Sequence, residues 1–479
     1  MTQLETQKNQ FNILDFQHYY LVGIKGVAMT GLAQILLDAG KTVRGSDTPE
    51  SFVTQQTLEK LGCAIDTDFS SPLPKETECV VYTGAHNGSL NPQVQAAHSQ
   101  HIPAFTHAQA LGSLSTQKRT IAVCGVGGKS TVSAMITWIL EKTGHKPSYA
   151  IGVGEIRGLA RNASWRDDSE LFVIEADEYT EDPSSSHSTG TLVPRFHYIQ
   201  PEIVVCTNIS FDHPDVYTSP EQTQRVFESF FKQIKPTGTL ITHQAVSATI
   251  PTHVNQVTYG TTGTFRYTIN HQPDQIKPQV TISYDQDATP LHLNVPGEHN
   301  IENATAAIAA TNLLDVTLSQ AADALGSFNS TSRRFEFLGT YQGAKLYDDY
   351  AHHPREIAAV IQTLKDFFPN QPSIVAFQPH TFSRTEALFD DFVTVLSAAD
   401  HCIILDIFGS AREQQTTATV SSATLSAAIQ AANPDATVAQ LSGVTQLASY
   451  CQQHLKEGDI FITLGAGDIY TVHDLLLSI

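Results

Sequence analysis

The sequence predicts an α/β protein built of three domains. The chain has 479 residues, more than the roughly 250–300 that one hydrophobic core usually holds. Three times along the chain, a short β-branched run passes through a glycine or acidic turn into a stretch of helical periodicity, which is typical of parallel α/β domains. We place the domains at residues 1–117, 118–331 and 332–479.

The composition indicates a globular protein that acts on small molecules. Hydrophobic residues make up 41% of the chain, and no apolar run approaches the roughly 20 residues that span a bilayer. The N-terminal residues lack the basic and apolar regions of a secretory signal, so we expect a cytoplasmic protein.

A formal net charge of −20 disfavours nucleic acid and anionic lipid as partners. The six cysteines form no CxxC pair and are predicted to be buried, reduced thiols. We expect a monomer or a homodimer.

The first domain opens with a strand at Tyr19–Val22, a glycine turn and a helix at about Thr30–Ala39. A diphosphate could rest on this helix N-terminus, while Asp47, after the next strand, reaches a ribose hydroxyl. Lys25 stands where the dinucleotide fingerprint has its middle glycine. A nicotinamide oxidoreductase is therefore only an alternative, and it leaves the motifs further along the chain without a role.

The second domain begins with a triphosphate-binding pattern. A predicted linker, Ser113–Thr120, leads into a strand at Ile121–Cys124, a glycine loop and a helix that begins near Lys129. In such a loop backbone N–H groups cradle phosphate oxygens, Lys129 neutralises charge and Ser130 ligates Mg²⁺. Only Val126 and Gly127 separate Gly125 from Gly128, so the loop is shorter than the usual one. The sequence therefore predicts ATP and Mg²⁺ as cofactors.

Carboxylates follow the next predicted strand, and a carboxylate and a histidine follow the one after it. Glu175–Glu178 comes directly after Leu171–Ile174, and Asp212 with His213 follows Ile203–Cys206. Open α/β sheets place their ligands at the carboxyl ends of their strands, and hard cations prefer oxygen ligands. We therefore predict that a carboxylate of the first cluster and the histidine of the second hold magnesium beside the phosphates.

The remainder of the chain predicts further elements and three polar segments. An antiparallel excursion is expected at Asn270–Leu293, followed by a helix that begins near Ile301. The third domain opens near Ser332, with strands at Lys345–Tyr347, Ile374–Phe377, Cys402–Leu405 and Ile460–Leu464. The polar segments are Gly297–Asn303, Asp348–Pro354 and Pro379–Thr385. Taken singly, each of them is equally well explained as a helix cap.

Together, in order and spacing, these motifs resemble the Mur ligase family over nearly the whole chain. The matching motifs are VGIKGVAMTG, EADE with TNI and DH, GEHNIENA, RRFE, YDDYAHHP, PHTFSRT and LGAGDIY. The resemblance implies an N-terminal Rossmann-like domain for a uridine nucleotide, a central P-loop ATPase α/β domain and a C-terminal Rossmann-like domain. It also implies an ATP-dependent ligase that joins L-alanine to the carboxylate of UDP-N-acetylmuramate through an acyl phosphate.

The resemblance also assigns roles to residues of this chain. It implies UDP binding by Gly23, Gly26, Ser46 and Asp47. It implies ATP binding by Gly125, Gly127, Gly128, Lys129, Ser130, Thr131, Asn300, Asn303, Arg334 and Asp349. It implies magnesium binding by Ser130, Glu175 and His213, and receipt of the amino acid by His352, His380 and Arg384. The residues expected to carry catalysis are Lys129, Glu175, His213 and Arg384.

Several positions depart from the family pattern and leave alternatives open. Val126 and Gly127 replace a threonine and a histidine, Thr381 replaces a common arginine, and Glu298 replaces a basic residue. The long stretch Thr180–Gln200 favours an alternative acceptor, the murein tripeptide of cell-wall recycling. The altered glycine loop motivates a third hypothesis, a catalytically inactive homologue that binds nucleotide without turnover.

Overall fold

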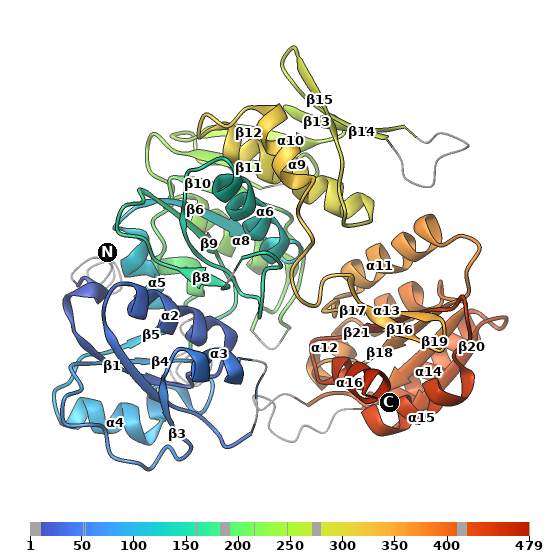
Figure 1. The fold of residues 1–479 in the computed structure, drawn as a ribbon, viewed down its shortest axis with the longest axis horizontal. Helices are drawn as coiled ribbons and strands as arrows, with labels where there is room; N and C mark the ends of the chain where they lie inside the picture. Colours follow the sequence, from blue (N-terminus) through green and yellow to red (C-terminus); the bar gives the residue numbers. More distant parts are fainter. Residues whose placement is uncertain are drawn as a thin grey trace.

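The computed structural model describes residues 11–50, 52, 54–159, 161–182, 192–214, 216–246, 248–270, 279–409 and 419–478. These residues form three β-sheets with five, ten and six strands. Helices flank each sheet, and the three units follow one another along the chain, from the N-terminal unit at the lower left of Figure 1 to the C-terminal unit at its right. The predicted α/β class with three domains is confirmed.

The first sheet is parallel throughout, in the order β3-β2-β1-β4-β5. Tyr19 and Leu21 of β1 pack with α2 and α5, whereas Tyr20 and Val22 pack on the other face with α4. The strands are β1 (His18–Val22), β2 (Thr42–Ser46), β3 (Ala64–Asp66), β4 (Cys79–Tyr82) and β5 (Ala104–Thr106). The helices are α2 (Val27–Asp38), α3 (Gln55–Lys60), α4 (Pro92–Ser99) and α5 (His107–Ser115).

The central sheet has the order β15-β14-β13-β12-β11-β10-β6-β9-β7-β8. Ile121 and Val123 of β6 pack with α6, α9 and α10, and Ala122 and Cys124 face the opposite side. The strands are β6 (Arg119–Cys124), β7 (Ser148–Ala150), β8 (Ala163–Ser164), β9 (Leu171–Glu175), β10 (Ile203–Cys206), β11 (Thr239–His243), β12 (Asn255–Gly260), β13 (Phe265–Asn270), β14 (Gln279–Tyr284) and β15 (Asp287–Leu291). The helices are α6 (Lys129–Lys142), α8 (Pro220–Phe231), α9 (Glu298–Asn312) and α10 (Leu318–Leu325).

The predicted antiparallel excursion is present, but it is not a separate unit. Strands β13, β14 and β15 pair antiparallel with one another and extend the edge of the central sheet. Residues 271–278 of the predicted segment lie outside the described residues. The helix expected near Ile301 begins earlier, at Glu298.

The third sheet has the order β16-β17-β21-β18-β19-β20, and β16 alone runs antiparallel to its neighbour. Its four predicted strands are present, whereas β16 and β20 were not predicted. The strands are β16 (Glu336–Tyr341), β17 (Ala344–Asp349), β18 (Ser373–Phe377), β19 (His401–Leu405), β20 (Thr437–Leu441) and β21 (Ile460–Leu464). The helices are α11 (Pro354–Phe367), α12 (Phe382–Ala387), α13 (Phe389–Leu396), α14 (Ser422–Ala432), α15 (Val444–His454) and α16 (Val472–Leu477).

The connection between the first and second units corrects the predicted linker at Ser113–Thr120. Residues 113–115 end helix α5 and residues 119–120 begin strand β6, so only Thr116–Lys118 lies between the two elements. The first unit also packs on the second. Gln34 of α2 donates to Asn162 at 2.9 Å, and Asp38 accepts from Arg161 and from Trp165 N.

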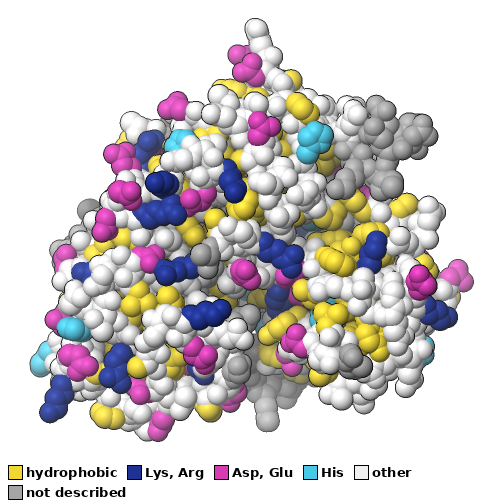
Figure 2. Space-filling model, viewed as in Figure 1, with side chains coloured by type: hydrophobic (Ala, Val, Ile, Leu, Met, Phe, Trp, Pro, Cys, Tyr) yellow, Lys and Arg dark blue, Asp and Glu magenta, His cyan; other side chains and the backbone are white. Residues whose placement is uncertain are grey.

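The described residues also bear on the expected absence of membrane spans, the burial of the cysteines and the distribution of acidic charge. Within that part of the chain, no helix is long and apolar enough to cross a membrane. All six cysteines are free; five of them are buried as predicted, whereas Cys63 is partly exposed. Figure 2 shows acidic side chains spread over the visible face rather than gathered in one patch.

Candidate active site

The glycine loop connects β6 to α6 and leaves its backbone open to a ligand. Gly125 and Gly128 have φ values of 128° and 83°, which residues with side chains rarely adopt. A Cβ on Gly125 would overlap Thr207 Oγ1, and one on Gly128 would lie 2.7 Å from Asn303 Oδ1. Two residues that follow β10 hold the loop in place: Thr207 Oγ1 and Asn208 Nδ2 donate to Gly127 O at 2.5 and 2.9 Å.

Lys129 lies at the start of α6, where its ammonium meets a buried carboxylate. Its Nζ donates to Glu178 Oε2 at 3.0 Å and to Gly125 O at 2.8 Å. Burial raises the pKa of Glu178 to about 7, although Lys129 acts in the opposite direction. Burial also acts against the charge of Lys129, but the neighbouring Glu178, Asp177 and Glu175 raise the lysine pKa above its ordinary value. The Lys129 ammonium, which the sequence predicts to bind phosphate, is thus paired with Glu178 in this structure.

The three residues predicted to bind magnesium are Ser130 in the first turn of α6, Glu175 at the end of β9 and His213, which follows β10. Ser130 Oγ donates to Glu175 Oε1 at 3.1 Å, and Gly152 N donates to Glu175 Oε2 at 2.9 Å. His213 Nε2 lies 3.7 Å from Glu178 Oε1. The described residues contain no cluster of three acidic, histidine or cysteine ligands. An ion here would therefore need oxygens from Ser130, water or phosphate, as Mg²⁺ commonly does.

A pocket opens beside the loop, between the central and C-terminal units. Asn300 and Asn303 of α9 line it, and Asn303 Nδ2 donates to Asn300 Oδ1 at 3.4 Å. Other predicted ATP residues that line it are Gly127, Gly128, Thr131, Arg334 and Asp349. The structure therefore brings one side of the predicted nucleotide site together from residues more than 200 positions apart.

Arg334 and Asp349 line the C-terminal side of this pocket. Asp349 accepts from Phe335 N and Ala351 N, both at 2.7 Å, and burial raises the pKa of its carboxyl to about 6 although Arg334 lies near. Arg334 Nη1 lies 3.7 Å from Glu356, a residue of the capping box that starts α11. The pocket therefore presents a guanidinium beside the glycine loop.

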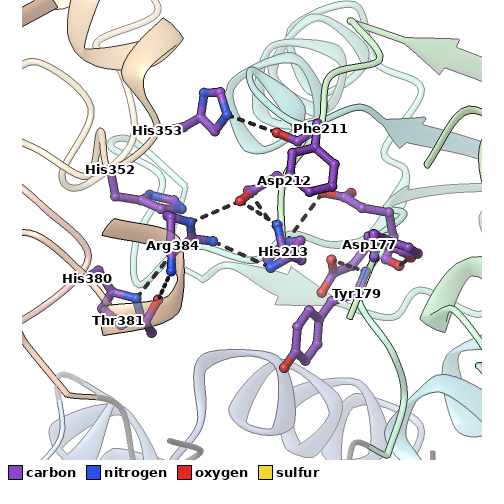
Figure 3. A network of polar contacts seen from close by, with 12 residues as sticks. Asp177, Tyr179, Phe211, Asp212, His213, His352, His353, His380, Thr381 and Arg384 are labelled. Carbon is purple, nitrogen blue, oxygen red and sulfur yellow. Dashed lines mark hydrogen bonds and ion pairs between the residues drawn. The ribbon is translucent and has the colours of Figure 1, made fainter. Parts of the chain in front are cut away.

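The residues predicted to receive the amino acid meet at the other end of the site (Figure 3). Arg384 Nε donates to Asp212 Oδ1 at 3.0 Å, and its two terminal nitrogens lie 3.4 Å from His380 Nδ1 and 3.5 Å from His213 Nδ1. The rings of His352 and His380 are 6.3 Å apart. Thr381 has a φ of 68°, which is unusual for a β-branched residue. Its hydroxyl caps α12 and thereby positions Arg384.

The four residues predicted to bind UDP lie together in the first unit, away from the glycine loop along the chain. Ser46 O accepts from Gly23 N at 2.8 Å, and Asp47 Oδ2 accepts from Lys25 N at 2.7 Å. Asp47 is 1% exposed and also lies 3.4 Å from His86 Nε2. In this structure the carboxylate orders the turn, and its contact with a ribose stays a prediction. Gly26 precedes the first residue of α2.

Several residues of the site carry roles that the sequence did not assign. Glu178 lies within the predicted acidic run, but sequence spacing does not show which of its carboxylates meets Lys129. Thr207 and Asn208 follow β10 and belong to the TNI motif, but the sequence gives them no role of their own. Glu356 carries no motif signal beyond its position three residues after His353, which is the spacing of a capping box.

Comparisons with known proteins agree with this geometry. Three family models match successive parts of the chain: "Mur ligase family, catalytic domain" at residues 18–119, "Mur ligase middle domain" at 123–311 and "Mur ligase, glutamate ligase domain" at 333–467. A UDP-N-acetylmuramate–L-alanine ligase from Desulfitobacterium hafniense is 34% identical over 471 residues, which cover 96% of this chain and 99% of the relative. The chain belongs to the Mur ligase family.

Further relatives of this Mur ligase are similar over their full length. A protein of the same name from Caldanaerobacter subterraneus is 34% identical, and the match covers 98% of this chain and 99% of the relative. A solved UDP-N-acetylmuramate–alanine ligase from Thermotoga maritima superposes with a TM-score of 0.78 at 23% identity, covering 96% of this chain and 98% of that one. The fold is therefore that of a Mur ligase, whereas the role of each site residue stays a prediction.

Proposed function

We propose that this Mur ligase joins L-alanine to the lactoyl carboxylate of UDP-N-acetylmuramate, with hydrolysis of ATP to ADP and phosphate, as a step of peptidoglycan precursor synthesis in the cytoplasm. The observation that carries the proposal is the agreement among relatives. Those at 32–34% identity that cover nearly the whole chain bear the name UDP-N-acetylmuramate–L-alanine ligase. The two domain boundaries, after residues 117 and 331, are part of this proposal.

The site residues suit the two chemical steps of such a ligation. In the first step a carboxylate oxygen attacks the γ-phosphorus of ATP, ADP leaves and an acyl phosphate forms. In the second step the amine attacks the acyl carbon and phosphate leaves. The glycine loop offers backbone N–H groups, and Lys129 offers a cation beside it, so both reduce repulsion between the reacting anions. No nucleophilic side chain is required.

The residues present also suit the metal. Ser130, Glu175 and His213 supply one hydroxyl, one carboxylate and one imidazole around the phosphate loop. Mg²⁺ held by these residues would offset the negative charge of the phosphates. Arg384 and His380 lie beside His213, so we place the acceptor amino acid at this end of the site.

The test is phosphate release by the purified enzyme with UDP-N-acetylmuramate, ATP and Mg²⁺. L-alanine, L-serine, glycine and murein tripeptide are supplied in separate reactions. We expect release that depends on the acceptor and is fastest with L-alanine. Faster release with the tripeptide would replace alanine by the alternative that the stretch Thr180–Gln200 favours; residues 183–191 of that stretch lie outside the described residues.

A parallel titration separates activity from binding. If the altered loop at Val126 and Gly127 abolishes turnover, ATP and UDP-N-acetylmuramate will still bind, but no acceptor will increase phosphate release. That outcome would support the inactive homologue and reject the ligase. Binding of NADH, followed by its fluorescence, would instead favour the oxidoreductase alternative.

A further inference from the structure

The C-terminal unit contacts a short segment of the central unit, residues 210–213, which follows strand β10. Arg355 Nη1 lies 3.4 Å from Ser210 Oγ, and His353 Nε2 donates to Phe211 O at 3.2 Å. Arg384 Nε donates to Asp212 Oδ1 at 3.0 Å. Figure 3 shows the last two contacts reaching the segment from the opposite unit. The segment ends at His213, a predicted magnesium ligand.

The contact between Asp212 and Arg384 differs from the other two in being buried at both ends. The side chains of Asp212 and Arg384 are 5% and 7% exposed, and the residues are 172 positions apart. A charged pair shielded from water cannot exchange its partners for solvent at low cost. This ion pair therefore fixes the relative position of the two side chains.

The geometry of the guanidinium extends this constraint to the whole head of Arg384. Its donors lie in one rigid plane, so anchoring Nε sets the direction of both terminal nitrogens. Those nitrogens lie beside His380 Nδ1 and His213 Nδ1. The same oxygen, Asp212 Oδ1, also accepts from His213 N at 2.7 Å. One carboxylate thus orients the predicted acceptor arginine and anchors the backbone of the predicted metal ligand.

We propose that Asp212 is a positioning residue for the second step of the reaction: it holds Arg384 in the orientation that receives the acceptor amino acid, in register with His213. The proposal rests on the proposed ligase function. Asp212 acts through Arg384 and not by direct contact with L-alanine. Its loss should weaken capture of the acceptor amino acid, whereas formation of the acyl phosphate on the side of ATP should continue.

Hydroxylamine separates the two steps. It attacks the acyl carbon of the acyl phosphate, phosphate leaves, and a stable hydroxamate forms. This small nucleophile carries no carboxylate, so it does not need Arg384. Hydroxamate formation from UDP-N-acetylmuramate, ATP and Mg²⁺ therefore reports the first step, and the KM for L-alanine reports the second.

The variants are Asp212→Asn, which keeps the shape and removes the charge, and Asp212→Ala, which removes the anchor. Ser210→Ala is the matched control, because it removes a solvent-exposed contact between the same two units. We expect Asp212→Asn to raise the KM for L-alanine at least ~10-fold, and Asp212→Ala to raise it further. Hydroxamate formation should stay within about 2-fold of the parent in Asp212→Asn. Ser210→Ala should resemble the parent in both assays.

The outcomes separate this proposal from the proposed function. A KM for L-alanine that is unchanged in Asp212→Asn overturns the positioning role. So does a parallel loss of hydroxamate and ligation in that variant when its melting temperature matches that of the parent, because Asp212 would then act in the first step. If the parent enzyme forms neither hydroxamate nor product, the ligase function itself fails. If about 10-fold more L-alanine restores the ligation rate of Asp212→Asn to that of the parent, the result supports the proposal.

Discussion

At the scale of single residues, the contact between Lys129 and Glu178 dominates the site. The Glu178 side chain is 2% exposed and the Lys129 side chain is 14% exposed, and their charged atoms are 3.0 Å apart. A phosphate that arrives at the loop must compete with Glu178 for this ammonium. The lysine therefore has two roles: it compensates a buried carboxylate in the resting enzyme, and it is predicted to neutralise phosphate during turnover.

These roles can be separated with two variants. Lys129→Met should reduce ligation at least ~1,000-fold, since the loop loses its cation. It should also destabilise the enzyme by about 2–4 kcal/mol, because Glu178 remains buried without its partner. Adding Glu178→Gln to Lys129→Met should recover most of the lost stability but none of the activity. Thermal melting and phosphate release measure the two effects; ligation by the double variant would show that Lys129 is not required.

The glycines of the loop should differ in their tolerance of a side chain. A Cβ on Gly127 would lie 3.6 Å from Glu356 Oε1, an ordinary contact distance, and Gly127 does not have a positive φ. Gly127→Ala should therefore keep the fold and bind ATP within about 3-fold of the parent. Gly125→Ala should lose ATP binding, because Gly125 has a φ of 128° and its Cβ would overlap Thr207. Calorimetric titration with ATP makes the comparison, and equal effects at both positions would contradict it.

The sequence predicts residues well where a motif fixes a backbone shape, and poorly where a side chain selects one of several partners. Gly125, Gly128 and Lys129 could be found because a strand, a loop and a helix occur in that order. The partner of Lys129 could not, since Glu175, Asp177 and Glu178 are all close in the chain. Only the path of the backbone after β9 determines which carboxylate reaches the lysine.

At the scale of elements, buried strands were predictable and edge strands were not. Strand β21 is buried throughout and apolar except for Thr463, so its sequence alone indicates a strand in the middle of a sheet. Strands β16 and β20 lie at the two edges of the third sheet and are largely unburied. Their mixed polar sequences give no continuous apolar run, so their pairing depends on neighbours distant in the chain.

Helix α16 packs a buried histidine against strand β21. His473 Nε2 lies 2.8 Å from Thr463 Oγ1, and the described residues offer its Nδ1 no hydrogen-bond partner. Burial lowers the pKa of His473 from 6.5 to about 4. On acidification the unfolded chain therefore takes up this proton first. The stabilising contribution is complete above pH 6.5 and is lost as the pH falls from 6.5 toward 4.

His473→Gln should remove this pH dependence, because glutamine keeps a hydrogen-bonding group near Thr463 but has no titrating proton. The parent should lose on the order of 3 kcal/mol from this residue by pH 4, relative to neutral pH. Unfolding by urea, measured at several pH values between 7 and 4, gives the difference between the parent and the variant. Identical pH profiles for the two proteins would show that His473 titrates normally in the folded state.

At the scale of the whole molecule, contacts between units assemble the site, and no sequence pattern predicted them. The resemblance indicated three domains, but not that α2 packs on the β7–β8 region or that residues 210–213 contact the C-terminal unit. Such contacts join residues more than 100 positions apart. Their physical basis is complementarity between folded surfaces, which becomes visible only after each unit has its shape.

Asp38 tests the contact between the first two units. Its carboxylate accepts from Ser164 Oγ and Trp165 N, both at 3.0 Å, and also pairs with Arg161. Asp38→Ala should destabilise the enzyme by about 1–3 kcal/mol, because three donors on the central unit lose their acceptor. Asp168→Ala, at an exposed carboxylate of the same region, is the control and should have little effect. Equal melting temperatures for the two variants would contradict the proposed role of Asp38.

The central claim is that this chain activates a muramyl carboxylate by phosphorylation. The most direct measurement uses UDP-N-acetylmuramate with ¹⁸O at both oxygens of its lactoyl carboxylate, together with ATP, Mg²⁺ and L-alanine, and determines the mass of the released phosphate. We expect each phosphate released during ligation to carry one ¹⁸O atom, because the attacking carboxylate oxygen leaves with the phosphoryl group. Phosphate without label, released during formation of the alanyl product, would contradict it.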